Sequence, residues 1–247
     1  MNLPVAILCG GMGTRLYPLT QHRPKSLVEV LGEPFIAHQL RLLKASGLER
    51  VVLCIGHQGA SLRDYTGNGK HFGLKVDYSV DGPMLLGTGG AVRQALPLLG
   101  DEFFVLYGDS YLPCDYETIG RHFQTSGKQA LMTVFRNDRQ WDTSNVEMSD
   151  GGAIVAYDKN SPNSRMDHID YGLGAFCASA FRRVPANERF DLAELYRQLL
   201  SAGELAAYPV KQRFYEIGSL EGIKELTNFL SEGRDNDFRQ AVSNRSR

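Results

Sequence analysis

The chain has 247 residues, of which 43% are hydrophobic, and its 27 basic and 28 acidic residues leave a formal net charge of −1. This length and hydrophobic content predict one sizeable core, as in a single α/β domain. The charge balance lacks the basic excess of a nucleic-acid-binding protein, so we expect no nucleic-acid partner. No apolar run reaches the roughly 18 residues of a membrane span, and no basic segment opens the chain. We therefore expect no membrane span and no signal peptide, which predicts a cytoplasmic protein.

The four cysteines predict no zinc site. Cys9, Cys54 and Cys177 stand in apolar, strand-like runs, and Cys114 follows a proline. No pair has the CxxC spacing, and no histidine and cysteine residues cluster in the sequence. Buried free thiols, as in a cytosolic protein, are the expected state.

The first predicted element is a buried strand at 5–9, which runs directly into a glycine-rich turn. Residues 10–26 read GGMGTRLYPLTQHRPKS. Because glycine has no Cβ, backbone N–H groups can approach a ligand, and successive N–H groups form an anion-binding concavity. An arginine offers a planar fork to phosphate oxygens, and a lysine offers a point charge. The turn therefore predicts a triphosphate cradle of Gly10, Gly11, Gly13 and Thr14, with Arg15 and Lys25 as the catalytic cations.

The two familiar phosphate-binding glycine motifs fit this turn poorly. A Walker loop has Lys-Ser or Lys-Thr after its last glycine, where this chain has Thr14 and Arg15. The dinucleotide fingerprint needs a third glycine at the position of Leu16. The alternative is a tight strand-to-helix turn with an incidental arginine, which the downstream Pro-Lys-Ser-Leu segment disfavours.

Further along the chain, buried strands alternate with amphipathic helices. This alternation predicts a parallel, doubly wound α/β sheet, and ligands bind such sheets at the carboxyl ends of the strands. Asp109 follows one of these strands, so we expect it to share a crevice with the glycine turn. The expected strands are 51–55, 76–80, 103–107 and 130–135, and the expected helices are 34–46, 59–65, 91–98 and 116–126.

The pattern changes after residue 135. We interpret about 136–180 as a small β-rich insertion that forms the second wall of the cleft. Ser219 is the expected N-cap of the last helix. Residues 1–230 thus form one predicted domain, and the polar residues 231–247 form a frayed tail. The elements expected here are strands at 145–148, 153–158 and 169–177, and helices at 191–201 and 220–230.

Four segments together resemble the signature of the sugar-1-phosphate nucleotidyltransferases, also called nucleoside-diphosphate-sugar pyrophosphorylases. They are GGMGTRLYPLT with the later PKSL, LLGTGGAVRQAL at 85–96, VLYGDSYL at 105–112 and FYEIGSLEGIKEL at 214–226. The resemblance covers about 3–230 and favours a compact form, similar to the heptose-1-phosphate guanylyltransferases and muramate-1-phosphate uridylyltransferases. It implies a Rossmann-like, mixed but mostly parallel sheet, with the insertion on the sugar side.

The resemblance also implies the reaction and its metal. The reaction is Mg²⁺-dependent transfer of a nucleoside monophosphate from a nucleoside triphosphate to a sugar-1-phosphate, with release of pyrophosphate. The implied metal residues are Asp109 and Glu216, and a carboxylate at a strand end suits Mg²⁺. Asp109 has the alternative role of capping the next turn. Glu216 stands where the family more often has aspartate, and its alternative role is a cap or salt bridge at the last helix.

For the nucleoside, the resemblance implies Gly87, Thr88 and Gly89 as part of a turn that binds the base and ribose, with Asp81 near the base-reading position. A simple helix-start turn is the alternative for the glycines. For the acceptor, it implies Lys159 as the residue that binds the sugar phosphate, although a solvated lysine is the alternative.

Three further residues are expected beside the sugar, and here the chain departs from the family. The family's Glu-Lys-Pro motif reads Asp-Lys-Asn, and its Asn-Ala-Gly segment reads Asp-Tyr-Gly. The sugar is therefore the least transferable part of the assignment. The residues are Asn145, Asp170 and Gly172.

Other functions stay open from the sequence alone. The same chemistry on a non-sugar phosphate, such as phosphocholine or a phosphonate, is favoured by an aromatic cage, for which Tyr157, Tyr171 and Trp141 are available. A catalytically inactive nucleotide-sugar sensor is a second alternative, which intact Arg15 and Lys25 disfavour. A nicotinamide-binding dehydrogenase lacks the third glycine. The sequence identifies neither the nucleobase nor the sugar, and it leaves open whether the chain forms a homo-oligomer.

Overall fold

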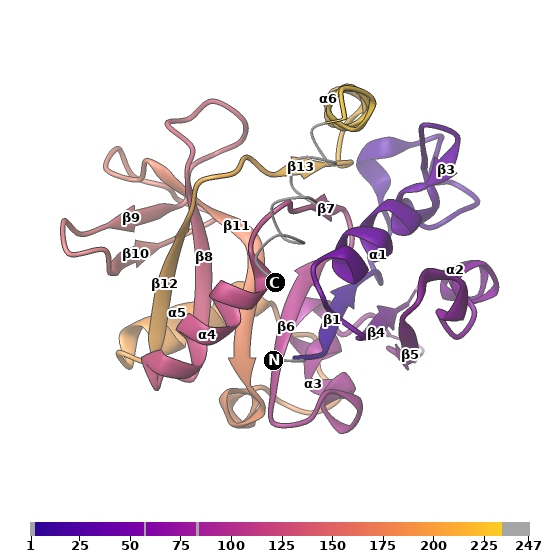
Figure 1. The fold of residues 1–247 in the computed structure, drawn as a ribbon. Coiled ribbons are helices and arrows are strands. Elements are labelled where there is room, and N and C mark those ends of the chain that lie inside the picture. Colours follow the sequence, from indigo (N-terminus) through magenta and orange to yellow (C-terminus); the bar gives the residue numbers. More distant parts are fainter. Residues whose placement is uncertain (1–2, 57, 83, 234–247) are drawn as a thin grey trace.

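A mixed sheet forms the centre of the computed structural model, which describes residues 3–56, 58–82 and 84–233 (Figure 1). Its strands are β1 (Val5–Leu8), β4 (Arg50–Ile55), β5 (Lys75–Val80), β6 (Glu102–Tyr107), β8 (Ala130–Arg136), β9 (Val146–Met148), β10 (Ile154–Tyr157), β11 (His168–Cys177) and β12 (Leu205–Val210). The strand order is β10-β9-β11-β6-β1-β4-β5, and β8 and then β12 pair outward from β11. The run β6-β1-β4-β5 is parallel, whereas β11 is antiparallel to both β6 and β8. The α/β class and the mixed sheet agree with the prediction.

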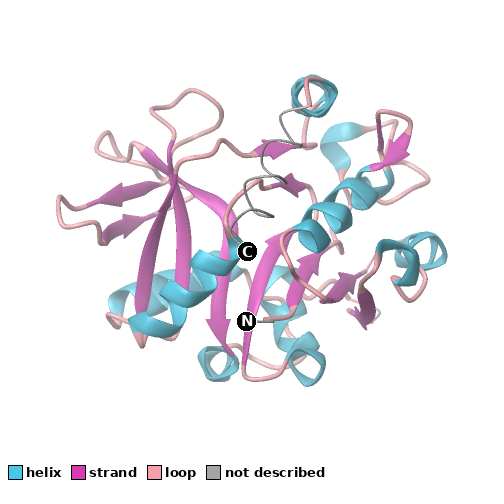
Figure 2. Cartoon of the chain, viewed as in Figure 1, coloured by secondary structure: helices cyan, strands magenta, loops and turns pink. Residues whose placement is uncertain are grey.

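Helices cover both faces of this sheet (Figure 2). They are α1 (Phe35–Ala45), α2 (Gly59–Thr66), α3 (Gly87–Leu99), α4 (Tyr116–Ser126), α5 (Leu192–Ser201) and α6 (Leu220–Ser231). Residues of α1, α2 and α4 belong to one buried cluster, and residues of α3 and α5 belong to another. The sheet therefore separates two hydrophobic cores, one on each face.

Strand β1 shows how the sequence specifies these two cores. Successive side chains of a strand point to opposite faces. Val5 and Ile7 accordingly join the cluster that contains Ile36 of α1, and Ala6 joins the cluster that contains Val92 of α3. All three β1 side chains are fully buried, which explains why a central parallel strand reads as a continuous apolar run.

The predicted elements are confirmed to within one residue at each end, except for the start of α3. Helix α3 begins at Gly87, four residues before the expected start at residue 91. Strand β11 lies between β6 and β8 and is one residue longer than expected. Strand β12 was not predicted, because its sequence LAAYPV has few β-formers and contains Pro209; the proline is tolerated because β12 is an edge strand. Most of the predicted tail lies outside the described residues.

Two small strand pairs stand apart from the main sheet. They are β2 (Glu29–Val30) with β3 (Glu33–Pro34), and β7 (Ser110–Tyr111) with β13 (Tyr215–Glu216). The second pair matters for the site, because it places the segment that precedes α6 against the end of β6. Figure 1 shows this late segment crossing from β12 on one side of the molecule to α6 on the other.

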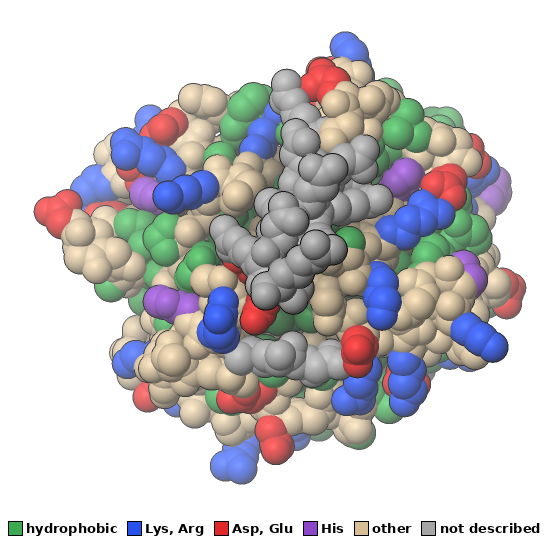
Figure 3. Space-filling model, viewed as in Figure 1, with side chains coloured by type: hydrophobic (Ala, Val, Ile, Leu, Met, Phe, Trp, Pro, Cys, Tyr) green, Lys and Arg blue, Asp and Glu red, His purple; other side chains and the backbone are tan. Residues whose placement is uncertain are grey.

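The described surface agrees with the balanced composition. Lysine and arginine side chains are interspersed with aspartate and glutamate on the described part of the face in Figure 3. Among the described residues, no helix combines the length and the apolar character needed to cross a membrane.

Candidate active site

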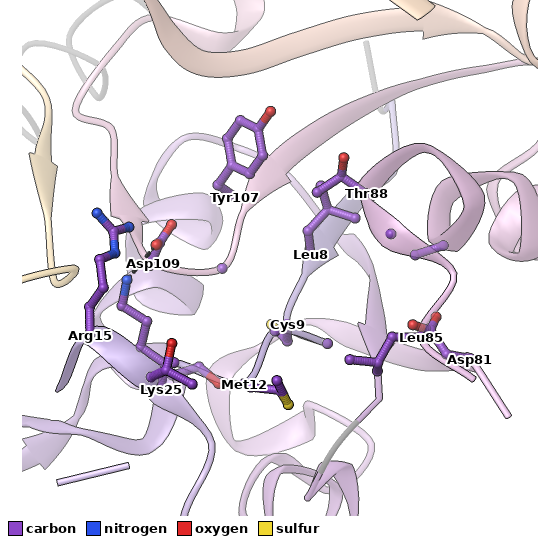
Figure 4. Close-up of a pocket in the computed structure, with 18 of the residues that line it drawn as sticks. Leu8, Cys9, Met12, Arg15, Lys25, Asp81, Leu85, Thr88, Tyr107 and Asp109 are labelled. Carbon is purple, nitrogen blue, oxygen red and sulfur yellow. Dashed lines mark hydrogen bonds and ion pairs between the residues drawn. The ribbon is translucent and has the colours of Figure 1, made fainter. Parts of the chain in front are cut away.

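The carboxyl ends of β1, β5 and β6 meet at a cavity of about 530 Å³ (Figure 4). This is the edge at which ligands bind open α/β sheets. Ten of the residues singled out in the sequence line the cavity together, although they come from four separate stretches of the chain. They are Gly10, Gly11, Gly13, Thr14, Arg15, Lys25, Asp81, Gly87, Thr88 and Asp109.

Two glycines of the glycine turn serve different purposes, one in the backbone conformation and one in the exposure of the backbone. Gly13 has φ 61°, a left-handed conformation that side chains rarely adopt, and it begins a short 3₁₀ helix at Thr14–Leu16. The Thr20 hydroxyl donates to the Gly13 carbonyl at 2.8 Å and holds this conformation. At Gly11, a Cβ would meet no atom within 4 Å. Gly11 therefore exposes backbone to the cavity, as a phosphate cradle requires.

The charged centre of the cavity is an ion pair between Lys25 and Asp109. The Lys25 Nζ lies 2.6 Å from Asp109 Oδ2, and only 14% of the lysine side chain is exposed. Figure 4 shows Arg15 beside this pair. Within the described part of the chain, the Arg15 guanidinium has no hydrogen bond or ion pair, so its donors are available to an anion.

Glu216 lies next to this pair but faces the start of α6. Its carboxylate accepts hydrogen bonds from the Gly218 N–H and from the Ser219 hydroxyl, the latter at 3.2 Å. Ser219 itself is the predicted N-cap of α6 and accepts the Gly222 N–H. Burial raises the pKa of Glu216, and the nearby Lys25 charge opposes that rise. The structure thus shows the helix-start contact foreseen as the alternative role, and it also places the carboxylate near Lys25.

The glycines at the start of α3 serve packing more than ligand contact. A Cβ on Gly87 would lie 2.7 Å from the Phe190 carbonyl oxygen, and a Cβ on Gly89 would lie 2.8 Å from the Phe190 ring. The N–H groups of Gly89 and Gly90 both donate to that carbonyl. Gly89 accordingly does not line the cavity, whereas Gly87 and Thr88 do. The helix-start alternative explains Gly89.

Lys159, which was expected to bind the acceptor phosphate, is held by Tyr107 and Asp170. Its Nζ donates to the Tyr107 hydroxyl at 3.1 Å and lies 3.5 Å from Asp170 Oδ2. The same ammonium sits 4.9 Å from the Tyr107 ring centroid. Burial lowers the pKa of Lys159, but its interactions with Tyr107 and Asp170 outweigh that effect, and the net pKa is raised. Lys159 is therefore a held cation rather than a freely solvated one.

Asp170, whose carboxylate lies beside Lys159, is itself held by Asn145 and Gly172. Asp170 is 3% exposed, and its carboxylate accepts the Gly172 N–H and the Tyr157 hydroxyl. The Asn145 side chain accepts the Asp170 N–H at 2.9 Å. Gly172 has φ 99°, within an irregular stretch of β11. These three residues lie near the predicted sugar side, but the contacts of Asp170 and Asn145 are with the protein.

Tyr107 is the functional candidate that the sequence analysis missed. It is the last residue of β6, lines the cavity and contacts Lys159, so it links the cavity to Lys159. Burial raises its pKa to about 12, so the hydroxyl stays protonated near neutral pH. Its position directly before the Gly-Asp strand end was the available signal.

Comparison with known proteins agrees with this arrangement. The protein-family model described as nucleotidyl transferase matches residues 5–232, so the chain belongs to the nucleotidyl transferase family. It is 27% identical to the Bacillus subtilis protein named "Probable glucose-1-phosphate cytidylyltransferase", over 94% of this chain and 98% of that protein. It is 25% identical to the D-glycero-alpha-D-manno-heptose 1-phosphate guanylyltransferase of Campylobacter jejuni, over 86% of this chain and 93% of that protein.

A solved structure shows the same fold. UDP-glucose pyrophosphorylase complexed with UDP-glucose superimposes with a TM-score of 0.76, covering 94% of this chain and 99% of the other. The two sequences are 18% identical, so this likeness concerns the fold alone.

Cys9 lines the cavity, yet we expect it to resist alkylation. Burial raises the pKa of its thiol to about 12, so little of the reactive thiolate is present at about pH 8. Burial also raises the pKa of Cys177, but this side chain is only partly buried. Iodoacetamide labelling followed by peptide mass spectrometry should therefore show Cys177 modified well before Cys9. Labelling of Cys9 at the rate of Cys177 would contradict the buried, protonated state.

Proposed function

We propose that this protein transfers a nucleoside monophosphate from a nucleoside triphosphate to a sugar-1-phosphate, producing a nucleoside-diphosphate sugar and pyrophosphate. The observation that carries the proposal is that two groups of cationic side chains lie at the same cavity. Arg15 and Lys25 lie at the glycine turn, and Lys159 is held by Tyr107 at the edge of the same cavity. Two separate cationic subsites suit a reaction between two phosphate-bearing substrates. Family membership and the named relatives support the same class.

The chemistry needs charge neutralisation and alignment more than a protein base. An oxygen of the acceptor phosphate forms a bond to the α-phosphorus, and the bond from that phosphorus to the β-phosphate oxygen breaks. A phosphate monoester has its second pKa near about 6, so the nucleophile is already largely dianionic at neutral pH. Catalysis can therefore rest on positioning and on cations that stabilise the charge of the leaving pyrophosphate.

A magnesium ion fits the carboxylates that are present. Asp109 and Glu216 are hard oxygen donors, and β7 and β13 bring their backbones together, with the Ile217 N–H donating to the Asp109 carbonyl at 2.9 Å. In the proposed function these two residues hold Mg²⁺, which neutralises triphosphate charge when bound. Two protein carboxylates leave further coordination positions for phosphate oxygens and water, as is usual for this ion.

The non-sugar alternative receives no support from the aromatic residues. Tyr157 donates its hydroxyl to Asp170, and Tyr171 is buried with its ring against Phe214. Trp141 instead covers the guanidinium of Arg213 at 3.4 Å. The three rings thus have separate environments, and they do not form one cage for a quaternary ammonium.

The test of the proposal is a pyrophosphate-release screen. Five nucleoside triphosphates are each combined with a panel of sugar-1-phosphates in the presence of Mg²⁺. We expect release for one nucleotide and acceptor pair only when both are present, and its loss in EDTA. Release without acceptor, or binding without turnover for every pair, would overturn the proposal and favour a hydrolase or a sensor.

Replacing Glu216 tests the metal assignment. Glu216→Gln keeps the shape and the contacts to α6 but removes a charge, so kcat should fall by about 100-fold or more. Glu216→Asp restores the residue commoner in the family and should retain substantial activity. Glu221→Gln, an exposed change in the first turn of α6, is the matched control. Normal turnover of Glu216→Gln with an unchanged Mg²⁺ requirement would leave Glu216 with only its role at the helix start.

Replacing Tyr107 tests the link to the acceptor lysine. Tyr107→Phe keeps the ring but removes the hydroxyl that accepts from Lys159, so the KM for the sugar-1-phosphate should rise by about 10-fold. The KM for the nucleotide should change by less than about 2-fold, because the cavity wall is kept. Tyr78→Phe, which removes a hydroxyl bonded to Thr66, is the control. Equal changes in both KM values would show that Tyr107 does not act through Lys159.

A further inference from the structure

The cavity has two chemically different ends. Figure 4 shows Arg15, Lys25 and Asp109 at one end, and Asp81 with Leu85 at the other. In the proposed function the first end holds phosphates. The second end must then face the nucleoside, and a carboxylate there repels phosphate and accepts hydrogen bonds from N–H groups.

A backbone N–H group close by in the sequence holds the Asp81 side chain at this end of the cavity. It follows β5 directly, and its Oδ2 accepts the Leu86 N–H at 3.2 Å. The same oxygen would lie 3.4 Å from a Cβ on Gly10, so it lies against the start of the glycine turn. The side chain is half-buried, and burial raises its pKa. Among the described residues, Asp81 has no ion pair, so lone pairs of the carboxylate are available to a ligand.

The walls around Asp81 suit a flat, apolar ring. Leu85 and Met12 line the cavity although they are large hydrophobic side chains that are 38% and 52% exposed. Figure 4 shows Leu85 beside Asp81, and Met12 between Asp81 and the Lys25 end of the cavity. Exposed apolar side chains beside a single carboxylate are the features expected of a nucleobase subsite.

The carboxylate distinguishes the bases by their hydrogen-bonding groups. Guanine has two adjacent donors, N1–H and the N2 amino group, which match the two oxygens of a carboxylate. Uracil and thymine place one N–H between two carbonyl oxygens, which a carboxylate repels. Cytosine and adenine each place an amino group beside a ring-nitrogen acceptor. Arg189 also lines the cavity, with its Cγ 3.4 Å from the position of a Cβ on Gly87, and arginine is the usual partner of guanine O6 and N7.

We propose that Asp81 reads guanine and that the nucleotide of this protein is GTP. The proposal rests on the proposed function, because it takes the Arg15 end as the phosphate end. It makes Asp81 a specificity-determining residue rather than a member of the catalytic machinery.

The test measures nucleotide binding without acceptor, so it does not depend on turnover. Isothermal titration calorimetry is run with GTP, UTP, CTP, dTTP, ATP and xanthosine triphosphate (XTP) in the presence of Mg²⁺. The wild-type protein should bind GTP about 10-fold or more tightly than the other nucleotides, as expected for one bidentate base contact. Equal affinity for all six, or a preference for a pyrimidine, would overturn the proposal.

The variant Asp81→Asn makes the test sharper. Its amide oxygen still accepts the Leu86 N–H, while its NH₂ group donates to the C2 carbonyl that xanthine has in place of the guanine amino group. GTP affinity should fall about 10-fold or more, and XTP should become the preferred nucleotide. Asp77→Asn, on β5 four residues before Asp81, is the matched control and should bind as wild type, because Asp77 pairs with Lys75 and does not line the cavity.

A purely structural role for Asp81 predicts a different outcome. Asp81→Asn would then weaken all nucleotides equally, or weaken none, and either result overturns the proposal. GTP-selective binding without any transfer to a sugar-1-phosphate would leave the base assignment standing and would contradict the proposed function instead.

Discussion

The ion pair between Lys25 and Asp109 is the contact on which the rest of the site depends. It joins two positions 84 residues apart, one in the short helix Lys25–Leu27 and one just after β6. The Asp109 carbonyl also accepts the Ile217 N–H, so the same residue anchors the segment that carries Glu216. Without the Lys25 charge, the carboxylates of Asp109 and Glu216 would lie near each other in a partly buried place, where like charges disfavour ionisation. The Lys25 charge thus offsets the repulsion between the two carboxylates, and it still offers a cation to the cavity.

A second constraint holds the two sides of the cleft together. The segment between β12 and α6 crosses from one side of the molecule to the other (Figure 1), and its side chains contact both sides. Arg213 lies under Trp141 and pairs with Glu225 of α6, and Phe214 packs edge-on against Tyr171. In the proposed function these packed side chains set the distance between the two substrates, which suits a reaction that relies on positioning.

The sequence predicted that the glycine turn and Asp109 meet, because the carboxyl ends of parallel strands meet at one edge of a sheet, and both line the same cavity. Asp81 lines it as well, and this residue was expected there from the family resemblance. The sequence predicted less where packing between distant parts of the chain determines the role of a residue. Gly89 is a glycine because Phe190, a hundred residues later, lies against it. Strand β12 was missed because neighbouring β8, and not its own composition, makes it a strand. Tyr107 was missed because its partner Lys159 belongs to a different part of the sheet.

The central claim is that the α-phosphoryl group, with its nucleoside, moves to the acceptor. The most direct measurement follows two labels in parallel reactions with the productive nucleotide and sugar-1-phosphate. With the α-phosphorus labelled, the account predicts that the label appears in the nucleoside-diphosphate sugar. With the γ-phosphorus labelled, it predicts that the label appears in pyrophosphate. A γ-label found in inorganic phosphate or on the sugar, with the α-label left in a nucleoside diphosphate, would contradict the account.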